Sequence, residues 1–179
     1  MKHILIGLVL FARYPTTDLI KEIREEYYLI NTSIHSYSKV TNNDINVYKD
    51  LNPNKYSFES EDIYRLAIIN LVRYYDNNQI KKAIVSFNGD REDLISTYYY
   101  KDESLFFVFK TKINYTNPKH SENFDENDKE VLEDRFYFNE NKLIKWIDSN
   151  KETVNLSTID NNLIKNLLSD AALYKSIVK

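Results

Sequence analysis

The chain has 179 residues and a mass of 21.3 kDa, and 24 Lys and Arg against 27 Asp and Glu give a net charge of -3. At 42% hydrophobic residues, a chain of this length buries roughly two-thirds of its unfolded surface, which excludes the disordered and fibrous classes. The absence of cysteine excludes a disulfide framework, a thiolate nucleophile and a Cys-ligated metal. Two glycines are too few for a phosphate-cradling loop.

The N-terminus predicts export. Residues 1–3 supply a short basic start, and an unbroken apolar run follows over residues 4–12. The run is too short for a membrane span, which needs ~20 residues, but it fits the apolar region of a secretory signal peptide. We therefore expect a signal peptide over 1–12, a single domain over 13–179, and a periplasmic or secreted protein with no membrane span. The alternative is a buried first element of a cytoplasmic protein.

Two segments have the spacing of amphipathic helices. Between residues 17 and 36 the apolar positions recur at steps of three and four, at Ile20, Ile23, Tyr27, Ile30 and Ile34. A second stripe begins at Ile159 and continues toward Ile177, with Asp160 as its N-cap. The segment from 39 to 62 has no sustained period, so we expect a connection there with at most one short strand, near residues 45–48.

An internal repeat carries the strongest structural signal. An aromatic pair, four polar residues and a new apolar run recur three times, beginning at Tyr74, Tyr99 and Tyr137. Short polar linkers between β-prone runs indicate hairpins, and strands joined so tightly pair antiparallel. The predicted strands lie near 64–75, 80–87, 94–100, 105–115, 133–138 and 143–148, and the turns lie at 77–78, 102–104 and 139–142.

These elements predict an α+β fold, in which an antiparallel meander sheet of about six strands packs with an N-terminal and a C-terminal helix on one face. Strand alternation should then send Leu105, Phe107 and Phe109 toward the helices. Phe106 should point to the open face of the sheet.

The hairpin sequences resemble a known family. Two segments are similar to the hairpins of a family of uncharacterised secreted or periplasmic bacterial proteins. The first is Tyr98-Tyr99-Tyr100 before Leu105-Phe106-Phe107-Val108-Phe109, and the second is Arg135-Phe136-Tyr137-Phe138-Asn139 before Lys142-Leu143-Ile144-Lys145-Trp146-Ile147-Asp148. Members of that family combine a leader peptide, an N-terminal helix and tandem aromatic hairpins. They usually have Asn-Gly at the turns, where this chain has Asn77-Asn78, Glu103-Ser104 and Glu140-Asn141. The resemblance implies the fold and brings no catalytic residues.

The sequence predicts no catalytic residue, no metal site and no cofactor. His3, His35 and His120 are scattered and form no metal-binding pair, and no serine has an elbow glycine. Segment 121–134 carries seven acidic residues against Lys129 alone, a net charge of -6. It lacks the calcium-loop pattern, so we interpret it as a solvated loop.

The aromatic residues of the sheet suggest a binding surface. If the helices cover one face, aromatic side chains must line the other, where they suit a protein, peptide or glycan partner. The candidate binding residues are Tyr98, Tyr100, Phe106, Tyr137 and Trp146. A nucleic acid partner is disfavoured, because the chain is mildly acidic and has no basic stripe.

The resulting hypothesis is an exported, non-catalytic binding domain. One alternative is a cytosolic inhibitor of the antitoxin or immunity type, which would use an acidic, hairpin-rich scaffold against a basic partner. The other is a hydrolase with a carboxylate site on the open sheet face, which a pocket holding two carboxylates would reveal.

Overall fold

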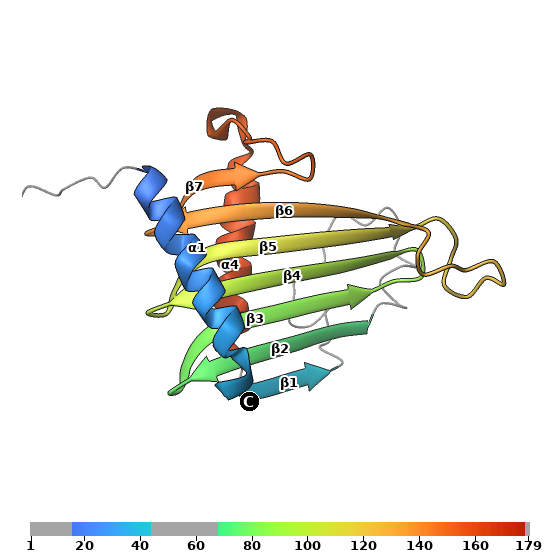
Figure 1. Ribbon diagram of the computed structural model, residues 1–179, viewed down its shortest axis with the longest axis horizontal. Coiled ribbons are helices and arrows are strands. Elements are labelled where there is room, and N and C mark those ends of the chain that lie inside the picture. The colour runs from blue at the N-terminus through green and yellow to red at the C-terminus, as the bar shows by residue number, and fades with distance from the viewer. Residues whose placement is uncertain (1–15, 44–67, 178–179) are drawn as a thin grey trace, which may run out of the picture.

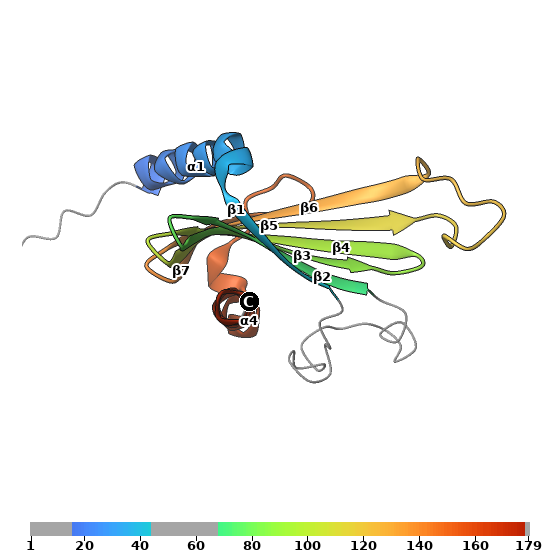
Figure 2. The same cartoon turned by 90° about the horizontal axis from the view of Figure 1, so that it is seen from below.

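The protein is an open antiparallel sheet with one long helix on each face. The computed structural model describes residues 16–43 and 68–177. Helix α1 (Thr16–Ser33), continued by the 3-10 helix η1 (Ile34–Ser36), and helix α4 (Asn161–Ser176) lie on opposite sides of the sheet, as Figures 1 and 2 show. The predicted α+β class is confirmed, and the expectation that both helices cover one face is wrong.

The sheet is a meander in which all neighbouring strands are antiparallel, as predicted. It has seven strands: β1 (Ser38–Asn43), β2 (Ile68–Asp76), β3 (Gln79–Asn88), β4 (Glu92–Lys101), β5 (Ser104–Tyr115), β6 (Lys129–Asn139) and β7 (Lys142–Ile147). A 3-10 helix, η3 (Leu156–Thr158), precedes α4. The additional strand is β1, an edge strand with little apolar alternation to mark it. The expected leader over 1–12 and the expected strand near 45–48 lie outside the described residues.

The three predicted hairpins form, with two-residue turns that contain no glycine. Each turn places two consecutive residues at positive φ, which type I′ turns require: Asn77 (48°) and Asn78 (66°), Asp102 (47°) and Glu103 (62°), Glu140 (48°) and Asn141 (61°). The second turn therefore lies one residue earlier than the family pattern implies. Asn and Asp accept this conformation more readily than Glu, so the two glutamates occupy the strained positions.

Each repeat has a β-bulge opposite its aromatic pair. The register shifts between Tyr99 and Tyr100, and equivalent shifts divide the other two aromatic pairs. Tyr99 pairs with Phe107 and Tyr100 with Leu105, so Phe106 is the extra residue. Because a bulge interrupts strict alternation, Phe106 and Phe107 both face α1, whereas Leu105 faces α4. The predicted grouping of Leu105 with Phe107 and Phe109, and the outward Phe106, are therefore wrong.

The two helices cover two separate cores. The core under α1 consists of Ile20, Ile23, Ile30, Tyr99, Phe106, Phe107 and Tyr137. The larger core under α4 includes Leu71, Ala83, Tyr98, Tyr100, Val108, Phe136, Phe138, Leu167 and Tyr174. As predicted, Asp160 caps α4: its side chain accepts a hydrogen bond from the Asn162 amide at 2.9 Å. Both helices cover the half of the sheet near the hairpin turns, and strands β3 to β6 extend beyond them (Figure 2).

A buried arginine ties the C-terminal end of α4 to the sheet. Arg73 on β2 is only 1% exposed. Its guanidinium donates to the backbone carbonyl of Ile177 and, over 2.9 Å, to Oδ1 of Asn42 on β1. The negative end of a helix dipole favours a cation, which helps to offset the burial of this charge.

Candidate functional site

A cavity of about 170 Å³ lies beside α4, where the helix stops covering the sheet. Four of its lining residues lie side by side on adjacent strands. Val85 on β3 pairs with Ser96 on β4, Ser96 pairs with Lys110 on β5, and Lys110 pairs with Asp134 on β6. Cross-strand neighbours in register share a face, so these four side chains form one row across the sheet. The cavity therefore combines apolar, hydroxyl, cationic and anionic groups on adjacent strands.

Helix α4 contributes Asp170 and Tyr174 to the same cavity. Asp170 is 5% exposed, and its Oδ2 lies 3.5 Å from the Tyr98 hydroxyl, which donates to it. The rings of Tyr98 and Tyr174 meet edge to face, with centroids 5.1 Å apart. Burial, and then the charge of Asp170, raises the pKa of neighbouring Tyr100 well above its ordinary value. Asp170 thus brings a negative charge into the wall of an otherwise apolar core.

The second carboxylate, Asp134, is held by an indole. Its Oδ1 accepts a hydrogen bond from Nε1 of Trp146 at 2.7 Å. The Trp146 ring stacks on Phe136, with centroids 5.1 Å apart and an interplanar angle of 26°. A carboxylate has about four acceptor positions, so the indole leaves Asp134 able to accept from a ligand.

The cations of the cavity come from β5. Lys110 lies in the row beside Asp134, with its Nζ 6.0 Å from the centroid of the Phe136 ring. Lys112 lines the cavity further from α4 and pairs with Glu92 at 2.9 Å. Two carboxylates and two ammonium groups therefore line one small cavity, together with the rings of Phe87, Tyr98 and Tyr174.

The five residues predicted to form an open aromatic face are divided between the two sides of the sheet. Tyr98 and Tyr100 are each 1% exposed under α4. Phe106 and Tyr137 belong to the core under α1, and Trp146 is half-buried against Phe136. The expected aromatic patch does not form, because a helix covers each face at this end of the sheet.

Two of these residues nevertheless belong to the candidate site, since Tyr98 lines the α4 cavity and Trp146 holds Asp134. Sequence reasoning missed Lys110 and Asp134, which meet only through the cross-strand register. Asp170 did leave a signal in the sequence. It interrupts the apolar stripe of the C-terminal helix, and a charge within such a stripe indicates a buried polar role.

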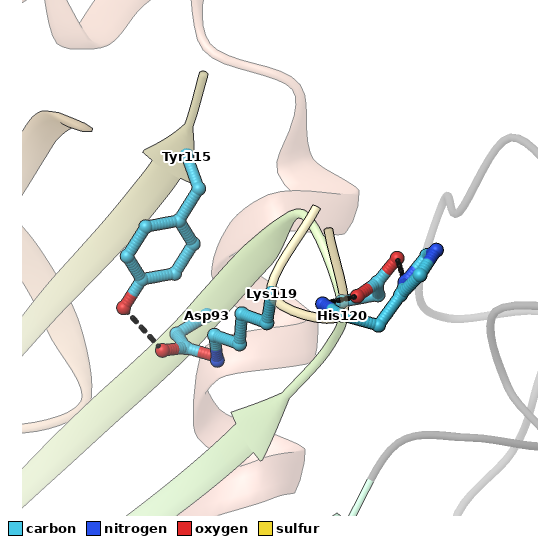
Figure 3. A network of polar contacts seen from close by, with 5 residues as sticks. Asp93, Tyr115, Lys119 and His120 are labelled. Atoms are coloured by element: carbon cyan, nitrogen blue, oxygen red, sulfur yellow. Dashed lines mark hydrogen bonds and ion pairs between the residues drawn. The ribbon is translucent and has the colours of Figure 1, made fainter. Parts of the chain in front are cut away.

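A separate polar network lies at the other end of the sheet (Figure 3). Asp93 on β4 accepts from the Tyr115 hydroxyl at 2.9 Å and from Nζ of Lys119 at 2.6 Å. The ammonium group of Lys119 also lies 4.9 Å from the centroid of the Tyr115 ring. Burial, and then the hydrogen bond to Asp93, raises the pKa of Tyr115 to about 12.

Asp90 extends this network to His120. One carboxylate oxygen lies 2.8 Å from Nδ1 of His120, the other accepts from the His120 amide at 3.3 Å, and the Asp90 carbonyl accepts from the Lys119 amide at 2.8 Å. The hydrogen bond to the His120 side chain holds the pKa of Asp90 below its usual range. Each named group has a protein partner, so the network anchors loop 116–128 to the β3–β4 connection.

The acidic segment belongs to this anchored loop and the start of β6. Asp125, Glu126 and Asp128 are exposed, in agreement with a solvated loop. No group of three or more His, Asp or Glu side chains in the described part of the chain is arranged to hold a metal ion.

Comparison of the chain with protein-family models, curated proteins and solved structures finds no match. Among the helices of residues 16–43 and 68–177, none is long and apolar enough to cross a membrane. The function is therefore inferred from the chemistry of the α4 cavity.

Proposed function

We propose that the chain is an exported, non-catalytic binding domain that holds one sugar unit of a glycan in the α4 cavity. The observation that carries this proposal is the convergence of carboxylates, ammonium groups and aromatic rings on one cavity. Sugar hydroxyls both donate and accept hydrogen bonds, so they need receptor groups of both kinds. The C–H face of a sugar ring packs on apolar side chains, and the half-buried Leu94 lines the cavity beside the rings of Phe87, Tyr98 and Tyr174.

The size and charge of the cavity limit the ligand further. Its volume of about 170 Å³ is below the ~300–1,000 Å³ of typical drug-sized sites, which favours a single small unit. Its lining contains Asp134 and Asp170 against Lys110 and Lys112, and Glu92, outside the lining, pairs with Lys112, so the cavity has no excess of positive charge. Such a site favours a neutral polar ligand over an anionic one.

Nuclear magnetic resonance titration tests the proposal. The ¹⁵N-labelled protein is titrated with glucose, galactose, mannose and N-acetylglucosamine while the amide signals of Ser96 and Lys110 are followed. At least one sugar should shift these signals, with a weaker effect in Asp134→Ala and Lys110→Met. The exposed Glu122→Gln change in loop 116–128 is the matched control and should leave the titration unchanged. If none of the four sugars shifts the cavity signals, the proposal fails.

A hydrolase is the second candidate, because Asp134 and Asp170 line the same cavity. Glycoside hydrolysis commonly uses two carboxylates that flank the bond to be cleaved. Chromogenic nitrophenyl glycosides of the same four sugars separate the two candidates. We expect binding without turnover. Hydrolysis that is lost in both Asp134→Asn and Asp170→Asn would replace the binding proposal with an enzymatic one.

The export part of the proposal is supported by the apolar run over residues 4–12 and distinguishes it from the cytosolic inhibitor. Intact mass and subcellular fraction of the native protein test this part directly. We expect a mature chain that begins close to Ala12, outside the cytoplasm. A chain that retains Met1 in the cytoplasmic fraction would favour the inhibitor.

A further inference from the structure

A second cavity, of about 160 Å³, lies at the edge of α1, on the opposite face of the sheet from the α4 cavity. Its aromatic lining comes from Tyr27 on α1, Phe107 and Phe109 on β5, and Tyr137 on β6. The ring centroid of Phe107 lies 5.4 Å from that of Tyr27 and 5.0 Å from that of Tyr137. These rings form a continuous wall against which a flat apolar group can pack.

Two arginines, Arg24 and Arg135, line this cavity, and its described lining contains no carboxylate. The guanidinium carbon of Arg135 lies 5.1 Å from the centroid of the Phe109 ring, so this ring helps to fix the cation. Nη2 of Arg135 donates to Glu133, outside the lining, at 2.6 Å. A guanidinium has five N–H donors, so Arg135 retains donors for a second anion.

The position of α1 above this cavity is fixed by contacts to the sheet. Oδ1 of Asn31 accepts from Nζ of Lys82 at 2.7 Å and from the Tyr99 hydroxyl at 3.3 Å. Earlier in the helix, Glu26 pairs with Lys101 at 3.1 Å. The cavity is therefore formed before any ligand enters, which reduces the entropic cost of binding.

We propose that this cavity binds an aromatic carboxylate. The aromatic ring of the ligand packs against Tyr27, Phe107 and Tyr137, and its carboxylate pairs with Arg135. Guanidinium and carboxylate match in planar, bidentate geometry, and Arg24 adds a second positive charge at the same cavity. Two sources present this chemistry, namely a free aromatic acid and the C-terminal aromatic residue of a peptide. The proposal is independent of the sugar site, which lies on the other face.

Isothermal titration calorimetry with benzoate, N-acetyl-phenylalanine and N-acetyl-phenylalanine amide tests the proposal. The two acids should bind, and the amide, which lacks the carboxylate, should bind far more weakly. Arg135→Met should lower the affinity for the acids by about tenfold to a hundredfold, the range expected for a hydrogen bond between charged groups. Arg91→Met removes an exposed arginine from the β3–β4 connection and should leave the affinity unchanged.

A change at Glu133 gives a prediction of the opposite sign. Because Glu133 competes with the ligand for Arg135, Glu133→Gln should raise the affinity for the acids. Arg135→Lys keeps the charge but loses the bidentate fork, so it should bind the acids more weakly than the wild type even if Arg135→Met does not fold.

The relative affinities of the two acids distinguish the ligand sources. Tighter binding of N-acetyl-phenylalanine indicates a peptide C-terminus, and tighter binding of benzoate indicates a free acid. The proposal is overturned if neither acid binds, if the amide binds as tightly as the acid, or if Arg91→Met weakens binding as much as Arg135→Met does.

Discussion

The two halves of the sheet are held together by different forces. The half near the hairpin turns lies between α1 and α4 (Figure 2), and aliphatic and aromatic side chains fill the space on both faces. The other half extends beyond both helices, and its end is held by hydrogen bonds and ion pairs around Asp93 and Asp90. Both candidate cavities lie at the edge of a helix, where side chains are supported by a core but a ligand can still reach them.

Truncation of buried aromatic residues should give the largest difference in stability between substitutions in the two halves. Phe106→Ala under α1 and Phe136→Ala under α4 should each lower the free energy of unfolding by about 3–5 kcal/mol, because each leaves a cavity in a packed core. Val131→Ala, in the uncovered half, removes a side chain that is 46% exposed and should cost well under about 1 kcal/mol.

Urea unfolding of the three variants measures these changes. Equal destabilisation by Phe106→Ala and Val131→Ala would contradict the burial of Phe106 beneath α1. Such a result would support the outward position of Phe106 that strict strand alternation predicts.

Removal of a buried carboxylate should have a smaller effect that again differs between the halves. Asp170→Ala should destabilise the protein by about 1–3 kcal/mol, because the Tyr98 hydroxyl loses an acceptor inside the core. Asp93→Ala should cost about 1 kcal/mol or less, since the Lys119 side chain that pairs with Asp93 is 31% exposed and water can solvate its ammonium group. Thermal unfolding of both variants makes the comparison, and a larger loss for Asp93→Ala would show that the polar network contributes more stability than we infer.

Glycine substitutions in the turns of the covered half should stabilise the protein. Glu140 has φ of 48°, a conformation that costs a residue with a Cβ atom more than it costs glycine. Glu140→Gly should therefore raise the free energy of unfolding by about 0.5–1 kcal/mol, although glycine adds entropy to the unfolded chain. Asn77→Gly should gain less, because asparagine already tolerates this conformation. A destabilised Glu140→Gly variant in chemical denaturation would argue against the turn geometry.

Tyr115 provides the pH test of the uncovered half. Its pKa of about 12 lies above the ordinary tyrosine value of about 10, so folding favours the neutral phenol. Its contribution to stability is complete below about pH 10 and is lost as the pH rises through about 12. The phenolate absorbance that disappears in Tyr115→Phe reports this titration. Asp93→Asn should lower the pKa but leave it above the ordinary value, because burial remains. A tyrosine that titrates normally in the wild type would contradict the network in Figure 3.

The local elements of this protein can be predicted from its amino-acid sequence. The three aromatic repeats predicted the hairpins and their order, and helical spacing with Asp160 predicted α4. These features follow from backbone conformation and hydrophobic period, which act over a few neighbouring residues. The edge strand β1 was missed because an edge strand pairs on one side and needs little apolar alternation.

The face that each residue occupies, and the residues that it meets there, depend on the tertiary structure. The bulge at Phe106 reassigned the side chains of β5, and the helices covered opposite faces because both faces are apolar near the turns. Lys110 and Asp134 become neighbours through strand register, and Asp170 joins them only when α4 docks. These contacts depend on residues far apart in the chain, whose proximity is set by the burial of whole faces rather than by local preference.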